Sequence, residues 1–207
     1  MKTTLIIPTF NEAENLPNLI TALFALPVTD LHVLVVDDNS PDGTGRIAEE
    51  LQNKFPGMIQ VLHRSGKLGL GSAYIQGFKA CLQDGSDYIG QMDADFSHEP
   101  AKILELAAAI PDCDMALGSR YVPGGSLDKE WAFWRKGLSA FGNYYARTIL
   151  GLPIRDVTGG FRLWKRETLS RLPLERVRSN GYVFQVEMAF VAHRLGFKMK
   201  EIPFHFA

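Results

Sequence analysis

The sequence "YIGQMDADFSHEP", residues 88–100, ends a short apolar run with two aspartates, Asp93 and Asp95, one residue apart. In an extended chain, residues i and i+2 point to the same side, so both carboxylates are expected to face one site beside the small Ala94. Two close carboxylates repel each other unless a cation or a proton lies between them. Mg²⁺ favours one or two carboxylates together with substrate phosphates, and Mn²⁺ is expected to do the same. The pattern predicts either a divalent-metal site or, equally, a solvated turn in which Asp95 caps the next helix.

Apolar runs alternate with helix-like segments on both sides of this stretch. This alternation is typical of α/β folds with a mainly parallel central sheet flanked by helices. Asn11 and Ser97 are candidate N-caps of the first and fourth helices. The expected strands are 3–8, 32–38, 58–64, 88–94 and 114–120, and the expected helices are 12–26, 42–54, 70–83 and 100–110.

Polar residues gather where the expected strands end. The segments concerned are "PTFNEAEN" (8–15), "DDNSPDGT" (37–44), "DADFSHEP" (93–100) and "GSRY" (118–121). In parallel α/β sheets, ligands bind at the carboxyl ends of the strands. We therefore expect one binding site along this edge.

An acidic pair, Asp37 and Asp38, closes the second expected strand. An acid there binds ribose in dinucleotide-binding folds, but those folds need a glycine-rich first loop, and 8–15 has no glycine. A different nucleotide site and a simple Asx-turn remain equally open. Gly69 and Gly71 do not complete a phosphate-binding motif because Tyr74 stands where its third glycine would be, so we expect a tight turn and close helix packing.

Arg120 follows the fifth expected strand, beside the acidic loop. A surface salt bridge would explain it but would add little stability. Because guanidinium matches the geometry of phosphate, we favour a contact with a phosphate or a leaving group.

The segment 130–152 is amphipathic and carries basic residues. Such a stripe usually faces the core. Large aromatic residues followed by basic ones also suit a membrane interface, and the two interpretations are equally open. The stripe consists of Trp131, Trp134, Leu138, Phe141 and Tyr145.

Composition narrows the function classes. The 207 residues are 46% hydrophobic, which suffices for one substantial domain. A net charge of −1 provides no bulk field for nucleic acid, so no nucleic-acid partner is expected. Two isolated cysteines indicate neither a disulfide framework nor a zinc site and fit a reducing cytoplasm. No apolar run approaches the roughly 20 residues of a membrane span, so we expect a soluble chain or one lying on a membrane surface.

Six ordered blocks together resemble one known family. They are "IIPTFNEAENL" (6–16), "VVDDNSPDGT" (35–44), "GLGSAYIQGF" (69–78), "MDADFSHEP" (92–100), "GSRYVPGG" (118–125) and "FWRKGLS" (133–139). The chain resembles family 2 glycosyltransferases of the GT-A fold, within the dolichyl or polyprenyl-phosphate mannosyltransferase group. The resemblance spans almost the whole chain and favours the metal-site interpretation of Asp93 and Asp95.

The resemblance also implies roles for individual residues. The metal ligand would be Asp95, together with Asp93, and Arg120 would contact the sugar-nucleotide side of the reaction. The acceptor phosphate would be held by Arg135 and Ser139. Ser97 stands where some relatives have glutamine near the metal. The donor-binding residues would be Pro8, Phe10, Glu12, Val36, Asp38, Asp93, Ala94, Asp95, Arg120 and Lys165.

The implied activity is inverting, Mg²⁺- or Mn²⁺-dependent transfer of mannose from GDP-mannose to a dolichyl or polyprenyl phosphate, at the cytoplasmic face of a membrane. Residues 1–120 would form a nucleotide-binding half and 121–207 an acceptor-binding half of one catalytic domain, with a further C-terminal segment expected beyond it. Three alternatives stay open. They are a UDP-glucose:polyprenyl-phosphate glucosyltransferase, a non-catalytic sugar-nucleotide or lipid-binding module, and an aspartyl-phosphate phosphatase with Asp93 as nucleophile.

Overall fold

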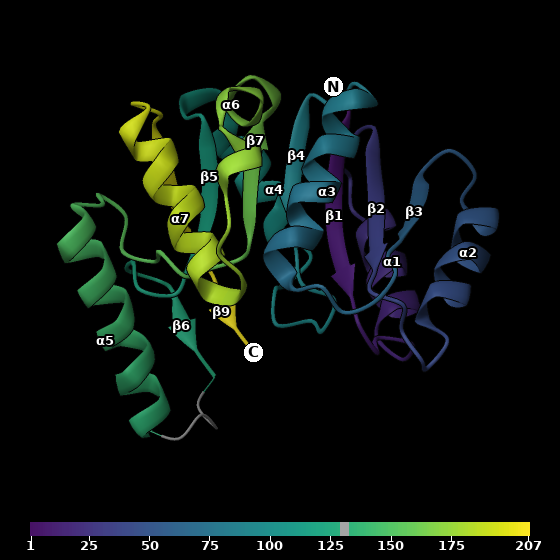
Figure 1. The fold of residues 1–207 in the computed structure, drawn as a ribbon, viewed down its shortest axis with the longest axis horizontal. Coiled ribbons are helices and arrows are strands. Elements are labelled where there is room, and N and C mark those ends of the chain that lie inside the picture. Colours follow the sequence, from purple (N-terminus) through teal and green to yellow (C-terminus); the bar gives the residue numbers. More distant parts are fainter. Residues whose placement is uncertain (129–132) are drawn as a thin grey trace.

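The computed structural model describes residues 1–128 and 133–207, apart from the side chain of Arg135. Within these residues one sheet has the strand order β3-β2-β1-β4-β7-β5-β8 (Figure 1). Its strands are β1 (Thr3–Thr9), β2 (Leu31–Asp37), β3 (Ile59–His63), β4 (Tyr88–Gln91), β5 (Met115–Ser119), β7 (Arg162–Lys165) and β8 (Met199–Pro203). The predicted α/β class and all five predicted strands are confirmed.

The sheet is mainly parallel, as predicted. Strands β3, β2, β1 and β4 run parallel to one another, and β5 runs parallel to β8. Strand β7, which the sequence did not reveal, lies antiparallel between β4 and β5. The carboxyl ends of β1, β2, β4 and β5 therefore meet at one edge, while the chain enters β7 from that same edge.

Helices cover both faces of the sheet. Alternation along β1 sends Leu5 and Ile7 to one face and Ile6 to the other, which gives two separate cores. The first core packs against α1 (Leu16–Phe24), α2 (Thr44–Lys54) and α4 (Lys102–Ala109). The second packs against α3 (Leu70–Gln83), α6 (Arg166–Arg171) and α7 (Gly181–Arg194). Short 3₁₀ turns lie at Ile110–Asp112 and Leu174–Arg176.

Three predicted helix starts are wrong, and α2 begins at Thr44, not at Asp42. Helix α1 begins at Leu16, not Glu12, because the backbone N–H groups of Glu12 and Ala13 donate to Thr44 Oγ1 (2.9 Å) and Asp42 Oδ2 (3.1 Å). These bonds tie the first loop to the start of α2, so Asn11 is no N-cap.

The fourth helix also starts later than the sequence indicates. Helix α4 begins at Lys102 with Ala101 before it, so neither Ser97 nor Asp95 caps it. The buried Ser97 Oγ has no hydrogen-bond partner among the described residues. Strand β4 ends at Gln91, three residues before its predicted end, so the chain turns off the sheet before the two aspartates.

Helix α5 (Phe133–Leu150) lies beyond the end of the sheet, near the short strands β6 (Ser126–Leu127) and β9 (His205–Phe206) (Figure 1). Its large apolar side chains are exposed, so the core-facing interpretation of this stripe is wrong. No helix among the described residues has the length and apolarity to cross a membrane. Trp131 lies outside the described residues. The exposed side chains are Phe133, Trp134, Leu138, Phe141, Tyr144, Tyr145 and Ile149.

The glycines at the start of α3 serve close packing. A Cβ built on Gly71 would lie 2.4 Å from the backbone oxygen of Ser179, and one on Gly69 would lie 2.8 Å from Asn180 Oδ1. The segment before α7 therefore approaches the start of α3 too closely for a side chain at Gly71. This arrangement agrees with the predicted turn and helix packing.

Replacing Gly71 tests this contact. Gly71→Ala is expected to lower the free energy of unfolding by about 1–3 kcal/mol, because a backbone atom must move to admit the methyl group. Urea denaturation measures the effect. In the matched control Gly137→Ala, within α5, the new Cβ meets no atom within 4 Å. This control should be neutral or gain up to about 1 kcal/mol. Unchanged stability of Gly71→Ala would contradict the packing argument.

Candidate active site

A cavity of about 550 Å³ opens at the carboxyl edge of the sheet. It receives residues from the loop after β4, the loop after β5, helix α5 and the loop before β7, so segments far apart in sequence build it together. Of the predicted site residues, Asp93, Asp95, Arg120 and Ser139 line this cavity. The other residues that line the cavity are Ser97, His98, Leu138, Gly142, Thr158, Gly159, Gly160, Tyr182, Phe204, Phe206 and Ala207.

The two aspartates converge as predicted, although from a turn and not from a strand. Asp93 is held from below by Tyr74, whose hydroxyl donates to Asp93 Oδ1 at 3.3 Å. Tyr74 is fully buried, and burial, followed by the charge of Asp93, raises its pKa well above the usual range, so it remains a donor. Asp95 is exposed and accepts the Ser97 N–H at 3.0 Å on Oδ1. Asp95 thus presents its carboxylate to the cavity.

His98 lines the cavity next to Asp93. Its Nδ1 accepts the backbone N–H of Asp93 at 3.1 Å, so the neutral ring carries its proton on Nε2. The ring stacks on Phe161 with centroids 5.0 Å apart. Burial lowers the pKa of His98, against the opposing charges of Asp93 and Asp95. Because the pKa of His98 is lower in the folded protein than in the unfolded chain, protonation of His98 favours unfolding. The protein therefore loses stability as the pH falls below the ordinary pKa of histidine, and His98 has no such effect at higher pH.

Arg120 forms a buried ion pair, which the sequence did not anticipate. Its Nε and Nη2 donate to Asp156 Oδ2 and Oδ1, both at 2.7 Å, and Nη2 also donates to Thr158 Oγ1 at 2.8 Å. Arg120 is 7% exposed and Asp156 is fully buried. The alternative of a surface salt bridge is therefore wrong. Arg120 still borders the cavity, and its contact with a substrate phosphate stays a prediction.

Helix α5 is tied to the same loop. Asn143 is buried, accepts the Val157 N–H at 2.9 Å and donates to Thr158 Oγ1 at 3.0 Å. One turn earlier, Ser139 Oγ and the Tyr121 hydroxyl are 2.7 Å apart. Ser139 therefore faces the cavity at a fixed position. The side chain of Arg135, on the preceding turn of α5, lies outside the described residues.

The predicted nucleotide side lies at the ends of β1 and β2, where Pro8 pairs in register with Val36. Asp42 forms an Asx-turn within 38–44, since its Oδ1 accepts the Thr44 N–H at 3.0 Å, and Asp37 Oδ2 accepts the Ser40 N–H at 3.1 Å. Asp38 instead pairs with Arg64, at 2.5 Å from Nη1. The side chain of Val36 is buried in the core, so only its backbone could reach a ligand.

The first loop supplies the remaining members of the predicted nucleotide side. Lys67 Nζ lies 4.1 Å from the centre of the Phe10 ring, a cation–π contact at the edge of the sheet. Glu12 Oε2 accepts from Asn15 Nδ2 at 2.9 Å, which braces the loop before α1. Ala94 is buried in the core between the two aspartates. Phe10 and Glu12 thus lie beside the loop of Asp38, as the sequence indicates.

Lys165 does not join these residues. It pairs in register with Tyr88, at the start of β4, whereas Asp93 follows the end of that strand. Three strand residues span about 10 Å, so Lys165 lies at the opposite edge of the sheet. The assignment of Lys165 to the donor diphosphate is therefore wrong. The antiparallel direction of β7, which the sequence did not reveal, accounts for the error.

The donor set at Asp93 and Asp95 suits a divalent cation that shares its shell with a ligand. Both residues supply carboxylate oxygens, which Mg²⁺ and Mn²⁺ prefer. Among the described residues, no group of three or more acidic, histidine or cysteine side chains could hold a metal alone. A cation here would complete its shell with oxygen atoms from water or from a bound phosphate.

Sequence reasoning missed three residues that position the site: Tyr74, His98 and Asp156. Tyr74 stood in the failed glycine motif, and His98 shows no metal-ligand spacing. Asp156 belongs to "DVTGGFR" (156–162), a stretch that reads as irregular loop. The one available signal was that Asp156 stands shortly before the paired glycines Gly159 and Gly160, because glycines allow the backbone to approach a ligand closely.

Removing Asp156 tests the buried pair. Asp156→Ala is expected to destabilise the protein by about 3–5 kcal/mol, because Arg120 would remain buried and unpaired. Urea denaturation measures the change. The matched control is Asp112→Ala, which removes an exposed partner of Lys200 at 3.1 Å and should cost no more than about 1 kcal/mol. Equal losses in the two variants would contradict the special weight given to the Arg120–Asp156 pair.

Comparison with known proteins identifies the family. The model of "Glycosyl transferase family 2" matches residues 4–172. The chain is 44% identical over 206 residues to the polyprenol monophosphomannose synthase of Mycolicibacterium smegmatis, covering 99% of this chain and 77% of that protein. It is also 44% identical over 207 residues to the undecaprenyl-phosphate mannosyltransferase of Micrococcus luteus, covering 100% of this chain and 84% of that one.

Solved structures with a similar fold include glucosyl-3-phosphoglycerate synthase from Mycobacterium tuberculosis. Its complex with Mn²⁺ and UDP-glucose gives a TM-score of 0.71 at 18% identity, covering 99% of this chain and 70% of that one. Its complex with Mg²⁺ and UDP gives 0.70 at 17% identity, with coverage of 99% and 70%. The chain therefore has the GT-A fold and belongs to glycosyl transferase family 2.

Proposed function

We propose that this protein transfers mannose from GDP-mannose to the phosphate of a polyprenol, with inversion at the anomeric carbon and with a divalent cation at Asp95 and Asp93. The observation that carries the proposal is that both aspartates, Arg120 and Ser139 line the same cavity. The names of the two relatives at 44% identity support the sugar and the lipid acceptor.

The donor nucleotide is proposed to lie along the ends of β1, β2 and β4. Phe10 and Asp38 would contact the base and ribose, with Pro8, Glu12 and the backbone of Val36 completing that pocket. The diphosphate would then reach Asp93, Ala94 and Asp95. This path follows the carboxyl edge of the sheet, where ligands of such folds bind.

A cation held by Asp95 and Asp93 would supply Lewis-acid stabilisation of the charge that develops on the departing diphosphate. Tyr74 and His98 keep Asp93 in place, through its carboxylate and its backbone N–H respectively. Among the described residues, the one hydrogen bond found for the Asp95 carboxylate is with the Ser97 N–H. The proposal therefore makes Asp95 the principal ligand. The buried Ser97 Oγ, which has no hydrogen-bond partner among the described residues, takes no part in this proposal.

The acceptor needs binding more than activation. A lipid phosphate is already anionic at neutral pH, so its oxygen can attack the anomeric carbon without a side-chain base. The one histidine that lines the cavity, His98, uses Nδ1 to accept the Asp93 N–H, so it has no free basic nitrogen. Ser139, and Arg135 as predicted, would hold the acceptor phosphate opposite the leaving diphosphate.

Membrane association is part of the proposal. The side chains of Phe133, Trp134 and Phe141 on α5 are 88%, 63% and 63% exposed, and they continue past the cavity wall formed by Leu138 and Ser139. Aromatic residues beside basic ones favour the membrane interface. This helix would hold the protein at the cytoplasmic face of a membrane, where the tail of the acceptor stays in the bilayer.

One alternative keeps the site but changes the donor. The Mycobacterium tuberculosis synthase with the same fold was solved with UDP-glucose, so the fold does not choose between GDP-mannose and UDP-glucose. A non-catalytic module with the same pockets would bind the nucleotide and cation without turnover. The family assignment and the position of Asp93 after β4 count against an aspartyl-phosphate phosphatase, in which the nucleophile follows the first strand.

Asp95→Ala tests the proposed metal ligand. The variant is expected to lose nearly all transfer of mannose from GDP-mannose to undecaprenyl phosphate in the presence of Mn²⁺, while its thermal unfolding stays near that of the parent. Labelled lipid product measures transfer. The control Asp112→Ala removes an exposed carboxylate paired with Lys200 at the far end of β5 and should transfer normally. Near-normal turnover by Asp95→Ala would overturn the assignment.

Ser139→Ala tests the proposed acceptor side. Loss of one hydrogen bond of about 1 kcal/mol is expected to raise KM for the polyprenyl phosphate roughly fivefold. KM for GDP-mannose should change little. Steady-state kinetics with each substrate varied in turn separates the two constants. Ser170→Ala, which removes an exposed hydroxyl on α6, serves as control. A change confined to the donor constant would place Ser139 on the wrong side of the reaction.

A further inference from the structure

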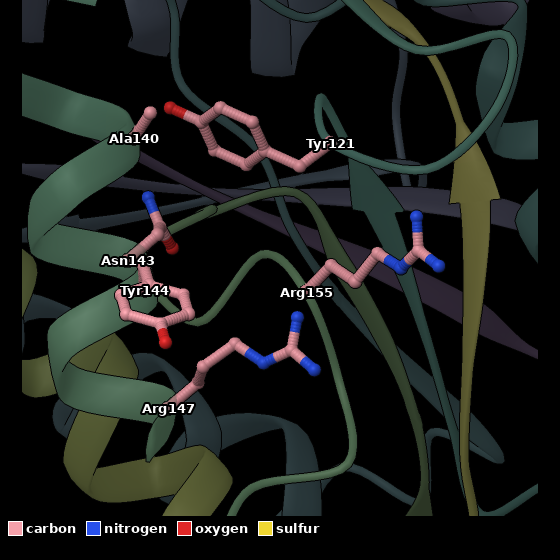
Figure 2. Close-up of a pocket in the computed structure, with 6 residues that line it drawn as sticks. All are labelled: Tyr121, Ala140, Asn143, Tyr144, Arg147 and Arg155. Atoms are coloured by element: carbon pink, nitrogen blue, oxygen red, sulfur yellow. The ribbon is translucent and has the colours of Figure 1, made fainter. Parts of the chain in front are cut away.

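A second pocket, of about 270 Å³, lies on the other side of α5. Figure 2 shows Arg147 reaching from α5 toward the loop that carries Arg155, and the side chain of Arg155 extending from that loop away from α5. Hydrogen-bonding groups of three further residues border it. The complete lining is Tyr121, Ala140, Asn143, Tyr144, Arg147 and Arg155.

The residues that line this pocket carry a net positive charge. Neither Arg147 nor Arg155 forms an ion pair with another residue that the structure describes, and no carboxylate is among the lining residues. The neighbouring acids are not lining residues, although Glu201 keeps its negative charge while it accepts neutral N–H groups. Asp156 pairs with Arg120, and Glu201 accepts the backbone N–H groups of Arg155 and Asp156, both at 2.9 Å. Two arginines that line one cavity, with no carboxylate among the lining residues, favour an anion there.

The pocket is separate from the transfer site. The two cavities share no lining residue. The bond between Tyr121 and Ser139, at 2.7 Å, stands between them, and the buried Asn143 fastens α5 to Thr158. An anion bound at Arg147 and Arg155 would therefore not occupy the place proposed for the acceptor phosphate.

The surroundings indicate where such an anion would come from. Tyr144, which borders the pocket, is 64% exposed, and Phe141, Tyr145 and Ile149 on the same helix are 63%, 57% and 64% exposed. An exposed aromatic face with arginines at its border is typical of proteins that lie in the head-group region of a bilayer. Guanidinium groups bind phosphate in a forked geometry that lysine cannot reproduce.

We propose that the pocket of Arg147 and Arg155 binds the phosphate of an anionic membrane phospholipid and so fixes the orientation of α5 on the bilayer. The inference rests on the membrane association in the proposed function, but it does not depend on the identity of the donor or the acceptor. The lipid bound here is a docking ligand and takes no part in the transfer reaction.

Vesicle partition of the double variant R147Q/R155Q tests the site. Each basic residue near an anionic surface contributes about 1 kcal/mol, so removing both is expected to weaken binding to phosphatidylglycerol vesicles roughly 20- to 30-fold at low ionic strength. The charge-matched control R46Q/K54Q alters exposed cations on α2, at the far end of the molecule from α5 (Figure 1), and should bind like the parent. Equal binding by R147Q/R155Q and the parent would overturn the proposal.

A conservative pair and a soluble anion sharpen the result. R147K/R155K keeps both charges but loses the forked geometry, and it is expected to bind phosphatidylglycerol vesicles less tightly than the parent. Binding equal to the parent would reduce the pocket to a diffuse positive field. Titration with inorganic phosphate, without vesicles, identifies a soluble ligand. Loss of phosphate binding in R147Q/R155Q with unchanged vesicle partition would assign the pocket to free phosphate and overturn the lipid.

Two further measurements distinguish the lipid-binding proposal from the proposed transfer activity and from self-association of the chain. Transfer to an acceptor dispersed in detergent should be unchanged in R147Q/R155Q, because neither arginine lines the transfer cavity. If the parent protein shows no transfer but the vesicle result holds, the proposed activity fails and the docking site stands. Sedimentation velocity of the parent and R147Q/R155Q should give the same mass. A change in self-association with no change in vesicle binding would assign the pocket to a second copy of the chain.

Discussion

The buried ion pair between Arg120 and Asp156 holds the two sides of the active-site cavity together. Arg120 follows β5, and Asp156 begins the loop that leads into β7. The bidentate contact fixes that loop where Gly159 and Gly160 border the cavity, and Thr158 and Asn143 extend the connection to α5. A pair buried this deeply gains little net stability over an apolar contact, yet losing one partner would be costly. Its main consequence is geometric, because it places the helix with Ser139 opposite the aspartates.

The cavity is chemically unequal on its two sides. One side carries Asp93 and Asp95, which form no ion pair with a lysine or arginine among the described residues, since Arg120 is neutralised by Asp156. The neutral His98 and the protonated Tyr74 hold Asp93 without neutralising it. A ligand that brings both a divalent cation and phosphate oxygens would satisfy this side. The opposite side belongs to α5, whose outer face is apolar and exposed, so a lipid-linked phosphate would complete the proposed site from the membrane.

Much of the fold could be predicted from local sequence patterns. The strands β1 to β5 follow from apolar runs, and their polar ends indicated the edge of the sheet at which the cavity lies. Strand β7 escaped because its four residues include Arg162, which is buried by donating to the carbonyl oxygens of Gly159, Gln185 and Val157. Burial lowers the pKa of Arg162 to about 10, and no local pattern signals such an environment. Missing this strand also led to the wrong placement of Lys165.

The candidate site was predictable where chemistry is local and not where it depends on distant packing. Asp93 and Asp95 are visible as a pair in the sequence. His98 gains its role only through Phe161, Phe204 and Phe206, which arrive from the far end of the chain. The stripe on α5 could face the core or a membrane until the structure showed its exposure. The pairing of Arg120 with Asp156 likewise depends on a loop conformation that no spacing reveals.

The most direct test of the central claim is a competition between donors. Purified protein would receive equal concentrations of ¹³C-labelled GDP-mannose and unlabelled UDP-glucose, with Mn²⁺ and undecaprenyl phosphate, and mass spectrometry would identify the lipid product. We predict that labelled mannosyl undecaprenyl phosphate forms together with free GDP. Chelation of the cation is expected to prevent its formation. An unlabelled hexosyl lipid, or binding of the nucleotide with no lipid product, would contradict the proposed function.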